Sequence, residues 1–136
     1  MAVRIDQAIF SRLSTNAALA SALTSPDGVV RVYPVRLPET LVLPAVSYQR
    51  ISGARDSTFT EDWRAMGVFQ FDCWATTYAG ARSLADLVLE ALQRSDFVLA
   101  GVTVLEALVQ SERDLYEDAA RLYRVSVDLE LQWRDG

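Results

Sequence analysis

The chain of 136 residues contains no histidine and no lysine, and it has a single cysteine. The lack of histidine removes the commonest general base and the commonest ligand of transition metals. Without lysine the chain can form no Schiff base, and no lysine can hold phosphate in a nucleotide-binding loop. Cys73 can form no internal disulfide, and its place in an apolar strand pattern predicts a small buried side chain. We therefore expect no enzymatic activity.

Long apolar runs are also missing. No apolar run reaches about 18 residues, the length that a transmembrane helix needs. The N-terminus alternates charged and apolar residues, whereas a signal peptide has a basic start and an unbroken apolar stretch. We expect a soluble, cytosolic protein with no membrane partner. The net charge of -5 argues against tight nucleic-acid binding, because cationic side chains supply most of the affinity for phosphate.

The residues that are present suffice for a sizeable core. Hydrophobic residues make up 51% of the chain, and its length lies within the usual range of one domain. We find no internal repeat, no low-complexity tract and no linker between domains. The sequence therefore predicts a single domain over residues 1–136.

A strand pattern that passes directly into a helix pattern is the most informative segment. Residues 68–75 alternate apolar and polar side chains, which predicts a strand with one buried face. In residues 79–92 apolar side chains recur three and four positions apart, which predicts a helix that packs on the sheet. Between the two patterns, Thr77 is placed to cap the first helical turn.

The remaining segments complete an alternation of helices and strands. Apolar spacing in residues 5–23 predicts a helix with a break, or a second short helix, after residues 14–16. Three prolines make the segment 34–44 an extended connector, because proline lacks the backbone donor that a central strand or a helix needs. Further strands are expected at 29–33, 45–52, 102–110 and 123–133.

This order predicts an α+β fold, with a mainly antiparallel β-sheet and two helical segments packed on one face. The strand at 123–133 is unusually long for so small a domain. Two placements fit its length. It projects beyond the sheet, or it pairs with a neighbouring subunit.

Two places are candidates for protein interaction. Residues 54–62 are polar, and we interpret them as a long hairpin loop, a class of segment that is often functional. Trp74 shares a strand face with polar residues, opposite the expected core, and an exposed aromatic ring there favours a partner. In the loop, the candidate contact residues are Arg55, Asp56, Phe59 and Glu61.

Four carboxylates lie in the charged segment 112–121, which we interpret as a turn. Such a cluster either binds a hard cation or forms a solvated acidic loop with arginine partners. We favour the solvated loop and predict no metal site. The carboxylates are Glu112, Asp114, Glu117 and Asp118, and the expected partners are Arg113 and Arg121.

Five segments together resemble a family of phage tail-completion proteins, or tail terminators. Much of this family was catalogued as a prophage domain of unknown function. The resemblance covers nearly the whole chain, in the same order and at the same length. The segments are YPVRLP (33–38), LPAVSYQRISG (43–53), DCWA (72–75), AD (85–86) and ERDLYE (112–117).

The resemblance implies a structural subunit of a long-tailed phage or a phage-like particle. Such subunits assemble into a ring, usually hexameric, on the head-proximal end of the tail tube, where the ring stops tube polymerisation. The implied partners are copies of the chain itself, the tail tube protein and the head connector, with assembly in the host cytoplasm. The resemblance implies no catalysis and no cofactor. DNA would pass through the lumen without specific binding, which suits an acidic subunit.

Two other functions remain open at this point. A head–tail connector or neck adaptor of the same kind of particle is also small and ring-forming. A small-ligand-binding α+β domain, from a different class of protein, would use the cleft between helix and sheet. The resemblance assigns no role to individual residues, so it does not decide between these functions.

Overall fold

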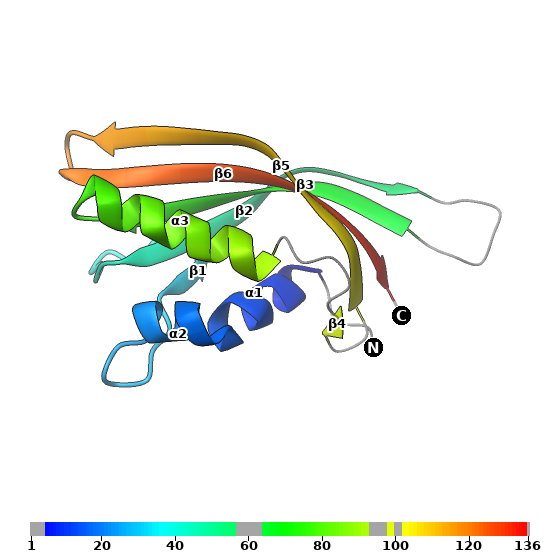
Figure 1. The fold of residues 1–136 in the computed structure, drawn as a ribbon, viewed down its shortest axis with the longest axis horizontal. Helices are drawn as coiled ribbons and strands as arrows, with labels where there is room; N and C mark the ends of the chain where they lie inside the picture. The colour runs from blue at the N-terminus through cyan, green and yellow to red at the C-terminus, as the bar shows by residue number, and fades with distance from the viewer. Residues whose placement is uncertain (1–4, 57–63, 93–97, 100–101, 136) are drawn as a thin grey trace.

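The structure is a computed structural model that describes residues 5–56, 64–92, 98–99 and 102–135 (Figure 1). Within these residues six strands form one sheet, in the order β1-β2-β3-β6-β5-β4. Every pairing is antiparallel except the parallel pairing of β1 with β2. The predicted α+β class is confirmed. The elements are α1 (Ile5–Thr15), α2 (Ala17–Leu23), β1 (Val32–Pro34), β2 (Ala45–Asp56), β3 (Arg64–Ala75), α3 (Tyr78–Leu92), β4 (Val98–Leu99), β5 (Val102–Glu117) and β6 (Leu122–Asp135).

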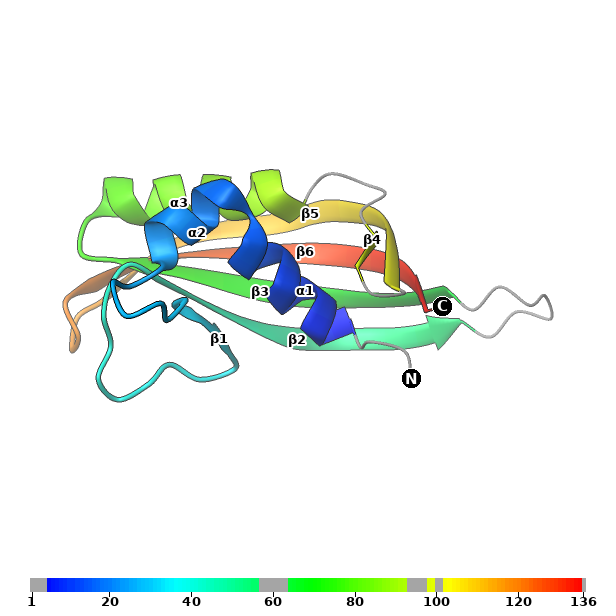
Figure 2. The same ribbon diagram turned by 90° about the horizontal axis from the view of Figure 1, so that it is seen from below.

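The helices of the described chain all lie on one face of the sheet (Figure 2). Helix α3 packs on β3 and β6, while α1 and α2 pack against α3. The core fills the space between the layers, and its largest fully buried side chains include Phe69, Phe71, Leu129 and Leu131. Cys73 is buried in this core, as predicted. None of the described helices is both long and apolar enough to cross a membrane.

The N-terminal helical segment consists of two helices because Asn16 interrupts it. The backbone of Asn16 is extended, with φ −62° and ψ 126°, and its Oδ1 accepts a hydrogen bond from the backbone N–H of Leu19 at 3.2 Å. This geometry caps the N-terminus of α2. The expected break is confirmed. Thr77 caps α3 similarly, since its Oγ1 accepts from the backbone N–H of Gly80 at 3.0 Å.

Two segments interpreted as loop or turn belong largely to strands. The prediction of a loop at 54–62 is wrong for residues 54–56, which continue β2 and pair with 64–66 of β3. The prediction of a turn at 112–121 is wrong as far as Glu117, because β5 continues to that residue and the turn covers only 118–121. In both places the backbone ladder holds a strand whose side chains are largely exposed or polar, so no apolar alternation marks it.

The long final strand is an interior strand. β6 pairs with β3 along one edge and with β5 along the other. The expectation that it projects from the sheet or pairs with a neighbouring subunit is therefore wrong. Its length is matched by two long strands of the same chain. At the other end of the chain, the strand expected at 29–33 begins only at Val32.

Gly67 lies on β3 under the ring of Trp133. A Cβ atom at this position would come within 3.2 Å of both the Ser52 carbonyl oxygen and the Trp133 ring. Its partner on β2 is Gly53, where the nearest atom to an added Cβ is 3.4 Å away, on the flexible side chain of Arg50. The two paired glycines therefore differ in the space that they leave.

We predict that Gly67→Ala lowers the free energy of unfolding by about 1–3 kcal/mol, because the added methyl group overpacks a strand against a buried ring. Gly53→Ala is the matched control. It should change the free energy by less than about 1 kcal/mol, since alanine there makes ordinary contacts and restricts the unfolded chain. Urea denaturation of both variants measures the difference. Equal effects at the two positions would contradict this prediction.

Tyr48 of β2 is a buried ionisable group in the core. Its ring stacks on Phe71 with centroids 6.2 Å apart, and its hydroxyl donates to the Asp6 carbonyl oxygen at 3.4 Å. Burial raises the pKa of Tyr48 from 10.0 to about 12, and the negative charge of Asp6 acts in the same direction. The pKa of the Cys73 thiol is also raised, first by burial and then by Asp72.

The raised pKa of Tyr48 predicts a loss of stability in alkali. The unfolded tyrosine ionises near its ordinary pKa of 10.0, whereas the folded one stays neutral up to about 12. Its contribution is therefore complete below the unfolded pKa and is lost as the pH rises to the folded one. Urea denaturation across this range should show a smaller decline for Tyr48→Phe than for the wild type. Tyr116→Phe, which replaces an exposed tyrosine, should keep the wild-type decline.

Candidate functional site

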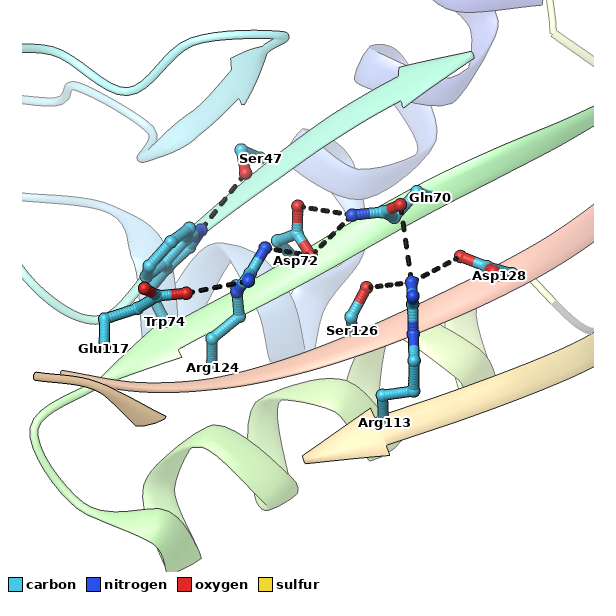
Figure 3. Close-up of polar contacts among 9 residues, drawn as sticks. All are labelled: Ser47, Gln70, Asp72, Trp74, Arg113, Glu117, Arg124, Ser126 and Asp128. Carbon is cyan, nitrogen blue, oxygen red and sulfur yellow. Dashed lines mark hydrogen bonds and ion pairs between the residues drawn. The ribbon is translucent and has the colours of Figure 1, made fainter. Parts of the chain in front are cut away.

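The face of the sheet that the helices leave uncovered carries a connected set of polar side chains (Figure 3). They occupy the alternate positions of four strands, opposite the residues that enter the core, as the two-residue period of a strand requires. We call them the polar face network. Its nine residues are Ser47, Gln70, Asp72, Trp74, Arg113, Glu117, Arg124, Ser126 and Asp128.

Arg124 is the centre of one half of the network. Its guanidinium lies 3.6 Å from Oδ1 of Asp72 and 2.7 Å from Oε1 of Glu117. It also lies over the ring of Trp74, with Cζ 5.2 Å from the centroid. The indole Nε1 of Trp74 donates to Oγ of Ser47 at 3.1 Å. Arg124 therefore connects β6 to β3 and β5, and Trp74 extends the connection to β2.

Arg113 is the centre of the other half. Its NH2 group donates to Oγ of Ser126 at 3.2 Å and to Oε1 of Gln70 at 3.5 Å, and it lies 3.6 Å from Oδ1 of Asp128. Gln70 joins the two halves, because its Nε2 donates to both carboxylate oxygens of Asp72 at 3.1 Å. The network therefore extends across the central strands.

The contacts within the network hold its side chains in place. Ser126 is fully buried, and Ser47 and Asp72 are only 5% and 7% exposed, although no described helix covers this face. Side chains that are already ordered lose little conformational entropy when a partner binds. The network offers no histidine to activate a nucleophile, and no cluster of three or more possible metal ligands occurs among the described residues. Its arrangement suits protein docking.

A second charged cluster lies on the helix side, where α3 meets β5. Arg82 pairs with Glu112, with Asp86 at 3.2 Å and with Asp114 at 3.7 Å. The hydroxyl of Tyr78 donates to Asp114 at 2.9 Å, and this hydrogen bond is the main reason that its pKa is raised. The hydrogen bond to Glu112 is the main cause of the raised pKa of Arg82.

The expected partners of the acidic segment are therefore wrong. Arg82 pairs with Glu112 and Asp114, and Arg124 pairs with Glu117, instead of Arg113 and Arg121. Strand geometry explains the difference, because neighbouring side chains of β5 point to opposite faces of the sheet. Reading 112–117 as a strand would have placed Arg113 opposite Glu112 and Asp114.

The candidate interaction residues do not form one cluster. Arg55 and Asp56 lie at the end of β2, in backbone pairing with β3. Phe59 and Glu61 lie outside the described residues. Trp74 lies on the polar face, as predicted, and belongs to the polar face network. The sequence analysis missed Arg113 and Arg124 as members of this surface, although their positions opposite core residues were a usable signal.

A shallow groove of about 280 Å³ lies between α2, α3 and the connector before β2. Its lining is mainly apolar and includes Leu43 and Leu84, with hydroxyl groups at Thr77 and Ser83 but no charged side chain. Only a small uncharged ligand would find complementary chemistry there. The groove lies near the helix–sheet cleft that a small-ligand-binding domain would use.

Comparison with known proteins decides the family. The model of the tail completion protein gp17 family matches residues 7–132. The chain belongs to this family. The resemblance found in the sequence is thereby confirmed, and family membership indicates a structural role in a tail. No curated protein sequence matches the chain.

Among solved structures, one match of this tail completion chain comes from the "Virion of native gene transfer agent (GTA) particle". The two chains are 22% identical, with a TM-score of 0.73, and the match covers 93% of this chain and 91% of the other. At this identity the likeness shows that the fold is shared.

In this tail completion protein, Arg124→Ala should lower the free energy of unfolding by about 1–3 kcal/mol, because it leaves the buried Asp72 carboxylate without its cation. Arg113→Ala is the matched control. The side chain of Arg113 is 51% exposed, against 23% for Arg124, so its loss should cost less than about 1 kcal/mol. Urea denaturation compares the two. A larger loss from Arg113→Ala would show that Arg124 is not the principal contact.

Proposed function

We propose that this chain is a structural virion subunit that forms a hexameric ring on the head-proximal end of a tail tube. The ring ends tube polymerisation and joins the tail to the head connector. The family match over residues 7–132 is the observation that carries the proposal. The likeness to a chain of a gene transfer agent virion supports it, because the same fold occurs there in a phage-like particle.

The mechanism is geometric. In a heterologous contact, one surface patch of a subunit meets a different patch on the next copy, and the chain of contacts closes when the rotation per copy divides a full turn. Capping follows if only one face of the ring matches the end of the tube. No bond is made or broken, so the role requires no catalytic group, no cofactor and no metal.

The polar face network supplies one surface suited to this role. It presents Trp74 and two arginines in fixed positions, so docking costs little ordering entropy. We assign contacts to this face and to the β2–β3 hairpin, which carries Arg55 and Asp56 in β2 and includes Phe59 and Glu61 in its sequence. The net charge of -5 suits a passage for DNA, because a cationic lumen would hold phosphates.

Deleting the gene from a particle-producing host tests this function. We predict tail tubes of abnormal, mostly excessive length that do not join to heads, since nothing stops tube growth. Negative-stain microscopy measures the lengths, and a plasmid copy of the gene should restore them. Tubes of normal length that remain unattached would instead indicate a neck adaptor. Normal mature particles would contradict both roles.

A further inference from the structure

The sheet has two free strand edges on opposite sides (Figure 1). β1 pairs with β2 only at Val46, Ser47 and Tyr48, so residues 49–56 have no strand partner on the outer side within the described chain. β4 pairs with β5 only at Val102 and Thr103, so residues 104–117 also have no strand partner on the outer side within the described chain. We call these segments the β2 edge and the β5 edge. Unpaired backbone groups along a strand are a template for another strand.

The directions of the strands allow copies to join in series. β2, β3, β6 and β5 lie in that order, and each runs antiparallel to the next. β5 therefore runs opposite to β2. When a second copy is placed beside the first in the same orientation, its β2 is antiparallel to the β5 of the first. The sheet then continues without a break, through a contact of two unlike edges, as a ring requires.

The two edges also match in position and in apolar surface. The backbone pairing can be followed from β2 through β3 and β6 to β5. It places Ser52 level with Leu108 along the strand direction, and Ala54 level with Glu106. Beside Ser52, the bulged residue Ile51 is 50% exposed, and Leu108 is 47% exposed. Two large apolar side chains thus lie at one level on opposite edges, where pairing of neighbouring copies would remove them from water.

The charges favour a contact between a β5 edge and a β2 edge over a two-fold contact between two β5 edges. The β5 edge is mainly acidic, whereas the β2 edge has more arginines than carboxylates. Pairing β5 with β5 would bring acidic strands together, and pairing β5 with β2 brings opposite charges together. The charged residues are Glu106, Glu112, Arg113, Asp114 and Glu117 on the β5 edge, and Arg50, Arg55 and Asp56 on the β2 edge.

We propose that the β5 edge of one copy pairs with the β2 edge of the next, as an antiparallel strand addition. The proposal rests on the ring of the proposed function and names the surface that builds it. Backbone hydrogen bonds provide the affinity, as in other cases of strand addition. The register is set by Ile51 with Leu108, which lies level with Ser52, the neighbour of Ile51.

Charges introduced at Ile51 and Leu108 in the full-length protein test the pairing. The wild type should associate in solution, as measured by sedimentation and native mass spectrometry with and without tail tube protein. Ile51→Glu and Leu108→Arg should each weaken association by about tenfold or more, because each places a charge in the apolar contact. The double variant should recover most of the loss. Amide hydrogen exchange in residues 104–110 should slow on association.

Val29→Arg is the control, since Val29 is an exposed apolar residue outside both edges and receives the same charge as Leu108→Arg. It should associate like the wild type, and circular dichroism checks that each variant folds. Three results would overturn the pairing: a wild-type monomer under every condition, association that neither single variant changes, or a dimer that Leu108→Arg strengthens. The tail lengths in the deletion experiment are independent of these results, so the two proposals fail separately.

Discussion

The packing of α3 on the apolar face of β3 and β6 is the contact on which the rest of the structure depends. β3 and β6 are interior strands, and their alternate side chains, such as Phe71 and Leu129, are fully buried beneath the helices. Each such side chain contributes about 1.5–3 kcal/mol to folding. Because strand side chains alternate between the faces, this packing also fixes which residues remain on the uncovered side.

The polar face network is a consequence of that one-sided arrangement. Residues opposite the core are not all solvated, because long neighbours such as Arg124 and Arg113 contact the shorter Asp72 and Ser126. Asp72 and Ser126 become buried in this way, and each has a polar partner. Buried polar groups need such partners, and several contacts per side chain hold the network in defined positions. A surface of this kind suits a subunit that works by docking.

The sequence predicted those parts of the fold in which burial leaves a regular pattern. The strand ending at Ala75, the helix after Thr77 and the final strand all have one buried face, and their periodicity was sufficient. Strand residues with exposed or polar side chains, as at Asp56 and Glu112, leave no such pattern, so their ladder was mistaken for loop or turn. Trp74 was placed on the correct face, but its partner Arg124 was missed, since pairing across strands depends on a register that one sequence does not display.

The burial of Arg31 could not be predicted from the sequence either, because burial of a charged side chain has no periodic pattern. Arg31 is 7% exposed, and it donates to the carbonyl oxygens of Pro44 and Ala22, which ties the connector to the end of α2.

The four long strands of the sheet have a consequence for assembly. Because their number is even, the first and last long strands run in opposite directions. Identical protomers in one orientation can therefore extend the sheet through antiparallel pairing. One additional full-length strand would change that parity and would require protomers to meet in parallel or to face in alternating directions.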